Sequence, residues 1–182
     1  MSEIPYTLIR SKRKTISIVI KPNGEVEVRC PTRCSKGAVE AFVVSKENWI
    51  RKHLQTVAAR PQLPMLTGVE LQELANRAEM VLPQRISFFA KQMGVTYGRI
   101  CIRSQRTRWG SCSPKGNLNF NCLLMLCPEE VRDYVVVHEL CHRKEMNHSA
   151  AFWAEVETLC PDYRAHRKWL RDNGASLIGR LP

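Results

Sequence analysis

The chain has 182 residues, of which 44% are apolar and 25% charged, ordinary values for a soluble globular protein. This length allows one well-cored domain, or a core domain with a small accessory lobe. No apolar run approaches the roughly 20 residues that span a bilayer, and residues 1–15 are polar where a secretory signal needs an apolar core. The composition argues against a membrane protein and predicts a cytoplasmic one.

The chain is strongly basic, with 28 Lys and Arg against 17 Asp and Glu and a formal charge of +11. Such a surplus attracts polyanions, namely nucleic acid, nucleotide phosphates or an acidic protein surface. A generally basic, solvated surface explains the charge equally well. The eight cysteines include no CxxC pair, and without an export signal we expect them to be reduced and mostly buried.

The first third of the chain is predicted to be β followed by helix. Residues 6–12, 15–21 and 25–30 alternate apolar and polar side chains, and Pro22-Asn23-Gly24 predicts a tight turn between the last two. Apolar residues then recur at helical spacing between Val39 and Leu54, in one or two helices. The segment from Arg60 to Leu66, with two prolines, is the expected linker. We therefore expect an N-terminal β-hairpin and helix lobe over residues 1–60 and a catalytic domain over 67–182.

A long helix is predicted to begin after Thr67, which forms a capping-box pattern with Glu70. Pro83 is expected to kink or divide this helix, and Gly94 to end it. Its apolar stripe consists of Leu71, Leu74, Ala78 and Leu82.

Residues 100–126 are punctuated by glycine and proline and predict a small antiparallel sheet, with a last strand at about residues 118–124. Pro128 suits the first position of a following helix, which extends through residues 131–144. At 100° per residue, Val131, Val135, His138 and His142 share one face of that helix, while other apolar residues occupy the opposite face. A helix that is apolar on both faces is buried between layers.

His138 and His142 lie one turn apart on this buried helix, so both imidazoles can reach one metal ion. Glu139 occupies the adjacent face, where a carboxylate can take a proton from water without binding the metal. This is the HExxH arrangement of zinc hydrolases, in which zinc makes water more acidic and the glutamate is the general base. The alternative is a pair of hydrogen-bonded core histidines.

A catalytic zinc needs a third protein ligand, for which His148 is the leading candidate. It can reach the other two only if the chain turns after His142, and Asn147 tolerates the left-handed backbone that such a turn favours. Ser149 then suits the N-cap of the next helix. The rival ligands are Glu145, Glu155 and His166.

Several motifs together resemble the YgjP-like metallopeptidase family, which is related to the SprT-like zincins. They are Arg108-Trp109-Gly110-Ser111-Cys112, the Asn-Phe-Asn of residues 119–121, the segment that ends in HELCH, and Asn147-His148-Ser149 followed by Phe152-Trp153. Further similarity lies at residues 161–163 and 169–170 and in the N-terminal strands. HExxH alone occurs in many unrelated zincins, whereas this combination is far more specific.

The resemblance implies an α+β protein with a zincin-like core, an active-site helix against a small antiparallel sheet, and an N-terminal β-rich lobe. It implies zinc held by His138, His142 and His148, with Glu139 as the base. The histidine spacing also matches the metzincins, but those enzymes place glycine where this chain has Glu145, and the chain offers no convincing methionine turn.

The resemblance leaves the substrate open, because members are classed as peptidases while a UTP pyrophosphatase activity has also been attached to the family. Arginine binds phosphate oxygens well, and Arg103, Arg106, Arg108 and Lys115 cluster beside the predicted site. The candidate substrate-binding residues are Arg108, Trp109, Asn121 and Tyr163.

Three functions remain at this point. The leading one is a zinc metallopeptidase acting on a peptide or protein, and the second is a nucleoside triphosphate pyrophosphatase using the same metal. The third is a basic nucleic-acid-associated protein with a structural zinc, although a structural site normally has four protein ligands.

Overall fold

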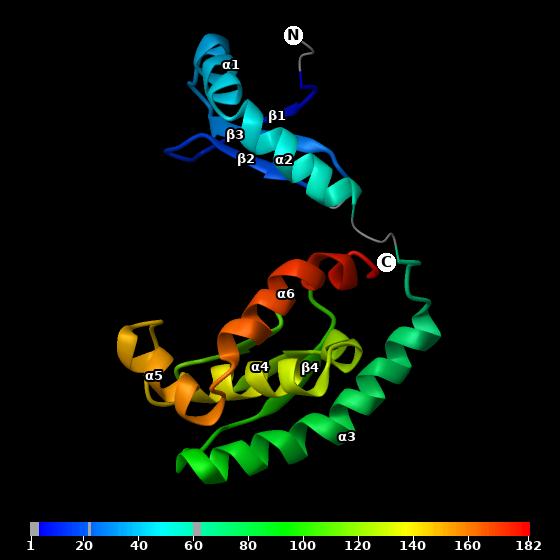
Figure 1. Ribbon diagram of the computed structural model, residues 1–182, viewed down its shortest axis with the longest axis vertical. Helices are drawn as coiled ribbons and strands as arrows, with labels where there is room; N and C mark the ends of the chain where they lie inside the picture. The colour runs from blue at the N-terminus through cyan, green and yellow to red at the C-terminus, as the bar shows by residue number, and fades with distance from the viewer. Residues whose placement is uncertain (1–3, 22, 60–62) are drawn as a thin grey trace. The chain divides into compact units, whose positions relative to one another are not determined.

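A computed structural model describes residues 4–21, 23–59 and 63–182. The protein is a mixed α+β chain, as expected, and it divides into two compact units, Met1–Gln62 and Leu63–Pro182 (Figure 1). Each unit has its own cluster of buried apolar residues. None of the helices in the described ranges combines the length and apolarity needed to cross a membrane.

The first unit is a three-stranded sheet with two helices. Strands β1 (Thr7–Ser11), β2 (Ser17–Ile20) and β3 (Val26–Pro31) lie in the order β1-β3-β2, with β1 parallel and β2 antiparallel to β3. Helices α1 (Lys36–Ser45) and α2 (Glu47–Ala58) follow. The predicted strands and helices of this unit are thus present, although burial does not alternate along β1 or β2.

The turn between β2 and β3 contains Gly24 at φ 85°, whose N–H donates to the Lys21 carbonyl at 2.9 Å. Pro22, and residues 60–62 of the expected linker, lie outside the described residues.

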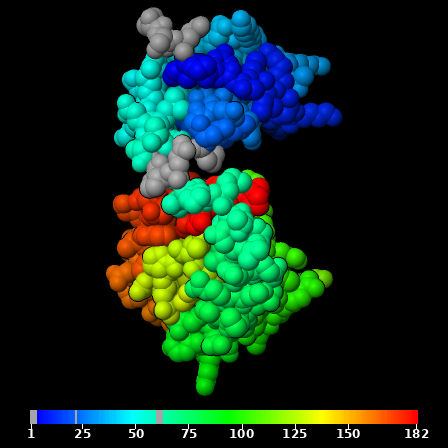
Figure 2. All heavy atoms as spheres, turned by 90° about the vertical axis from the view of Figure 1, so that its right-hand side faces the viewer, coloured from blue at the N-terminus to red at the C-terminus, as the bar shows by residue number. Residues whose placement is uncertain are grey.

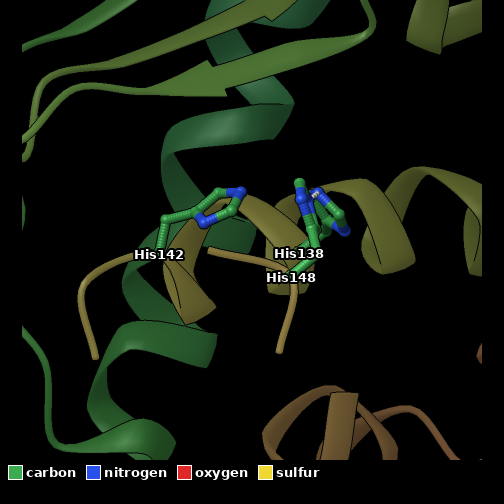
Figure 3. Close-up of side chains that lie close together, drawn as sticks. All are labelled: His138, His142 and His148. Atoms are coloured by element: carbon green, nitrogen blue, oxygen red, sulfur yellow. Dashed lines mark hydrogen bonds between the residues drawn. The ribbon is translucent and has the colours of Figure 1, made fainter. Parts of the chain in front are cut away.

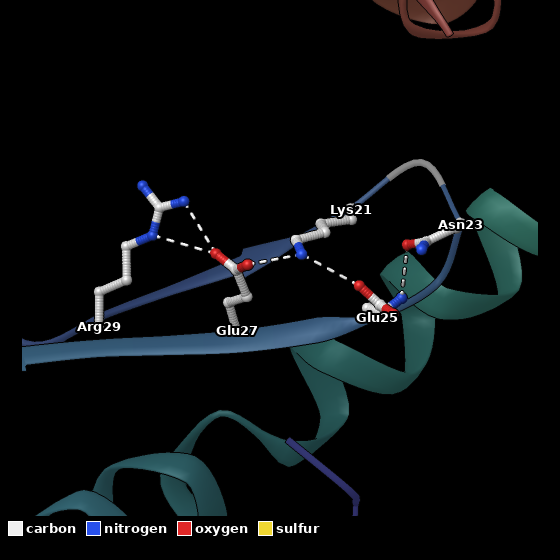
Figure 4. Close-up of polar contacts among 5 residues, drawn as sticks. All are labelled: Lys21, Asn23, Glu25, Glu27 and Arg29. Carbon is white, nitrogen blue, oxygen red and sulfur yellow. Dashed lines mark hydrogen bonds and ion pairs between the residues drawn. The ribbon is translucent and has the colours of Figure 1, made fainter. Parts of the chain in front are cut away.

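Paired charges follow the turn on strand β3, where Glu27 is only 7% exposed. Lys21 lies 2.6 Å from one of its carboxylate oxygens and Arg29 lies 2.8 Å from the other (Figure 4). These bonds lower the pKa of Glu27. The alternate residues Val26, Val28 and Cys30 are buried in the apolar cluster of this unit, so the strand separates an apolar face from a charged one.

The second unit begins with helix α3 (Gly68–Met93), which extends along one side of the unit (Figures 1 and 2). The Thr67 capping box is present, and Gly94 ends the helix in the left-handed conformation at φ 64°. Of the two effects expected of Pro83, a kink or a division of the helix, division is wrong, since α3 continues for ten residues beyond it. Leu82 and Ile86 are fully buried on either side of the proline, so packing of the apolar face overrides the missing hydrogen bond.

The sheet of the second unit has strands β4 (Ile100–Arg103), β5 (Gly110–Cys112) and β6 (Leu118–Asn121) in the order β4-β6-β5. The expectation of an antiparallel sheet holds for β5 and β6 only, because β4 is parallel to β6. The expected last strand is also too long, since Cys122–Leu126 forms a 3₁₀ helix, η1. The Asn121 side chain accepts a hydrogen bond from the Leu123 N–H and caps that helix.

Helix α4 (Glu129–Cys141) packs against α3, β5, α5 (Ala150–Leu159) and α6 (Tyr163–Ile178) (Figure 1). Pro128 is its N-cap rather than its first helical residue. Residues 134–137 are all buried, which confirms that α4 is enclosed on more than one face. The end of this helix therefore holds its side chains in fixed positions.

Candidate metal centre

Three histidines converge at the end of α4 and the turn that follows it (Figure 3). His138 and His142 lie one helical turn apart, and His148 comes from the loop before α5. One ring nitrogen from each lies within 4.8 Å of the others, and the Nε2 atoms of His138 and His148 are 3.1 Å apart. The structure thus brings together the three residues that the sequence singled out.

The rival ligands do not join this group in the described residues. Glu155 forms an ion pair with Lys144 at 2.8 Å. His166 lines a pocket with Asp133 and Asp162. Glu145 enters the site through its backbone, since its carbonyl lies 3.1 Å from His142 Nδ1.

The turn between His142 and His148 is built differently from the expectation for Asn147. No described residue other than glycine has a positive φ, so Asn147 is not left-handed. Instead the Lys144 and Glu145 N–H groups donate to the Cys141 carbonyl, and the Asn147 side chain accepts from the Ser149 N–H at 3.2 Å. A short polar side chain bonded to the backbone two residues ahead turns the chain without strain. Ser149 caps α5 as expected, accepting from the Phe152 N–H.

Aromatic rings hold the histidines in place. The Phe152 ring centroid lies 4.9 Å from that of His138 and 4.7 Å from those of His142 and His148. Trp153 stacks on His148 at 5.7 Å, and Tyr163 stacks on Trp153 at 5.2 Å. Since these rings pack on His148, an otherwise exposed side chain acquires a defined orientation.

The chemistry of this donor set fits a zinc ion. Burial, together with the neighbouring His142 and His148, lowers the pKa of His138 to about 3, and burial also lowers the pKa of His148. Both rings are therefore neutral near pH 7, the form in which imidazole binds metal. Tetrahedral zinc with bonds of about 2.0–2.1 Å holds its ligand nitrogens about 3.3 Å apart, close to the 3.1 Å between His138 and His148.

Glu139 lies beside these ligands, only 5% exposed, under strand β5. A Cβ atom on Gly110 would come within 2.7 Å of Glu139 Cγ and Oε1, so the absence of a side chain there allows the close approach. Burial raises the pKa of Glu139 to about 8, while the Arg108 charge and a hydrogen bond from the Cys112 backbone act in the opposite direction. The carboxyl group thus has a strong affinity for a proton.

Asn121 is buried and fully hydrogen-bonded within the protein. Its Nδ2 donates to the carbonyls of Gln105 and Arg108 at 2.7 and 3.0 Å, and its Oδ1 accepts from Leu123. Each polar atom of this side chain therefore has a partner within the protein. Through these bonds Asn121 anchors the loop that leads into β5.

The other three candidate substrate-binding residues differ in exposure. Trp109 packs closely against Gly174 of α6. A Cβ atom built on Gly174 would lie only 3.1 Å from the Trp109 ring. Tyr163 is 5% exposed within the aromatic stack. Arg108 is exposed just before β5, whereas Arg106 of the same basic cluster donates to the Pro182 carbonyl.

Two further residues at the site, Phe152 and Arg167, were not among the predicted site residues, although Phe152 belongs to the motif that carries the family resemblance. Phe152 contacts all three histidine rings, and the Arg167 guanidinium lies 4.9 Å from the centroid of the Trp153 ring. Arg167 follows Tyr163 by four residues, so helical spacing places both on one face of α6 and is the signal that could have found it.

The chain was compared with solved structures, curated proteins and family models. Among solved structures it is similar to the metallopeptidase zymogens of Pyrococcus abyssi abylysin, at 22% identity and TM-score 0.46, and Methanocaldococcus jannaschii jannalysin, at 20% identity and TM-score 0.42. The alignments cover 50% and 48% of this chain and 91% and 93% of those chains. No curated protein matches. The model of the YgjP-like metallopeptidase domain matches residues 14–73 and 69–173, and the chain therefore belongs to the YgjP-like metallopeptidase family.

Proposed function

We propose that this protein is a zinc-dependent metallopeptidase in which His138, His142 and His148 hold the metal and Glu139 is the general base. The observation that carries the proposal is the convergence of three imidazole nitrogens within 4.8 Å beside a buried glutamate. We further propose that residues 67–182 form the catalytic domain and residues 1–60 an accessory lobe. The family assignment supports the same class of chemistry.

Zinc bound by three histidines would supply Lewis-acid polarisation of a peptide carbonyl and would make water more acidic. Glu139 would take the proton from the attacking water and deliver it to the amine that leaves. Its low exposure keeps bulk water from competing for that proton.

Strand β5 offers a place for the substrate backbone. It lies at one edge of the sheet, since the order is β4-β6-β5, and it passes over Glu139. An extended peptide can add to such an edge through main-chain hydrogen bonds. Gly110 leaves the approach to Glu139 free of any side chain of its own.

The number of ligands argues against a purely structural zinc in a nucleic-acid-associated protein. A structural site is normally closed by four protein ligands. Among the described residues only three metal-binding side chains come together, which leaves one coordination position for substrate or water.

Metal analysis of the native protein, paired with assays on denatured casein and on UTP, tests this proposal. We expect about one zinc per chain, and casein cleavage that a chelator abolishes and added zinc restores. Turnover of UTP without proteolysis would contradict the peptidase assignment and favour a pyrophosphatase.

A further inference from the structure

Two arginines next to the candidate site form no ion pair within the described residues, and the carboxylate on which the Arg108 charge acts is that of buried Glu139. Arg108 is exposed and lies two residues before Gly110, the residue in contact with Glu139. Arg167 lies over the ring of Trp153, which itself stacks on His148. In the described part of the chain, no carboxylate lies within 4.0 Å of either guanidinium.

Several charged side chains around these two arginines already have partners. Glu155 and Glu157 of α5 are paired with Lys144 and Arg164. Arg143, a third cation near β5, donates to the carbonyls of Thr96 and Pro114. Among the described residues, the side chains of Arg108 and Arg167 form no ion pair and donate no hydrogen bond, so their donors are free for a ligand.

The surroundings hold the backbone of Arg108 and the side chain of Arg167 near the candidate site. The Arg108 carbonyl accepts a hydrogen bond from buried Asn121, which holds the start of β5 in place. The stack of Arg167, Trp153 and His148 connects the second guanidinium to a proposed metal ligand. An arginine presents a planar fork of donors that matches a carboxylate.

We propose that Arg108 and Arg167 make this site selective for peptide substrates that carry acidic side chains beside the scissile bond. The inference rests on the proposed peptidase function and names its substrate class. Arg108 would contact the residues that lie over the start of β5, and Arg167 those near His148. An excess of positive charge would also draw acidic chains toward the site from a distance.

Peptide pairs that differ only by Glu or Gln at one position on either side of the cleaved bond test the inference. For at least one position we expect the Glu peptide to have about tenfold higher kcat/KM at low salt, the size of one charge-assisted hydrogen bond. The preference should shrink as ionic strength rises, because salt screens exposed charges. Arg108→Gln and Arg167→Gln should each reduce it.

Arg77→Gln is the matched control, since Arg77 is exposed on α3 and its loss removes the same charge far from β5 in the chain. This variant should keep the full Glu preference. Equal cleavage of Glu and Gln peptides by the native protein, or a preference unchanged in both site variants, would overturn the inference while leaving a peptidase in place. Absence of any peptide cleavage, or turnover of UTP instead, would overturn the proposed function itself.

Discussion

Gly110 is the residue that lets strand β5 lie directly over the proposed general base. A Cβ atom at this position would sit 2.7 Å from Glu139 Cγ and Oε1, closer than Cβ atoms come to their neighbours in proteins, so Gly110→Ala must displace the carboxylate or the strand. Misplacement of a reacting group by about 1 Å costs on the order of 100-fold in rate. We expect Gly110→Ala to lower kcat on casein by about 10- to 100-fold while zinc content is unchanged.

Gly68→Ala is the control for that experiment, because a Cβ atom at Gly68 would meet nothing within 4 Å. It removes a glycine from the same unit and should leave kcat as it is. If Gly110→Ala retained full activity, the close contact between β5 and Glu139 would not be needed for catalysis.

Asn121 is expected to act on stability rather than on substrate binding. Asn121→Ala would leave the partly buried carbonyl of Gln105 and the buried N–H of Leu123 without this partner. Loss of such bonds costs about 1–3 kcal/mol, so urea unfolding should show a free energy of unfolding lower by about 2 kcal/mol. A fall in substrate affinity with unchanged stability would instead restore Asn121 as a substrate contact.

Among single residues, the sequence predicted best those whose role follows from their spacing along a helix. The histidines at 138 and 142 and the glutamate between them follow from the helical period, and the structure brings His148 to them. The anchoring role of Asn121 could not be predicted, because its partners Gln105 and Arg108 lie 16 and 13 residues away in sequence and meet it only in the folded loop.

Helix α3 carries a proline in its interior without interruption. Proline there costs about 3 kcal/mol relative to alanine, because it removes a hydrogen bond and crowds the preceding turn. Pro83→Ala should therefore raise the free energy of unfolding by about 1 kcal/mol or more, as measured by urea titration. Destabilisation would show that Pro83 packs or shapes α3 in a way that alanine cannot replace.

The second sheet shows what strand patterns leave undetermined. Alternation of apolar and polar residues predicts which face of a strand is buried, but β4 and β6 would show the same alternation whether parallel or antiparallel. The loop over residues 104–109 places β5 at the edge and lets β6 pair between β4 and β5. The side chain of Asn121 then ends β6 by capping η1. This end could not be predicted, because residues 122–126 form a continuous apolar run that also suits a strand.

The molecule as a whole has two separate apolar clusters, one in each unit. The proposed metal ligands all belong to the second unit. A ligand that binds only the folded form stabilises it by about 4 kcal/mol when its concentration is 1,000 times its Kd. We expect removal of zinc by a chelator to lower the melting temperature of the second unit and to leave that of the first unchanged.

Hydrogen exchange during heating can follow the two units separately. Equal loss of protection in both units after chelation would contradict the prediction, since it would mean that the metal stabilises the whole chain. The α+β class and the capping box at Thr67 were predictable from local patterns. That residues 1–60 and 67–182 are separate domains stays a prediction until this measurement is made.

The most direct test of the proposed mechanism is casein hydrolysis by zinc-loaded Glu139→Gln protein beside the native protein. Glutamine has nearly the same shape as glutamate but cannot accept the proton, and loss of a general base costs about 100- to 10,000-fold in rate. We expect the variant to hold as much zinc as the native protein and to lose activity on that scale. A variant that holds zinc and cleaves casein at the native rate would contradict the role of Glu139 and the hydrolytic site built around it.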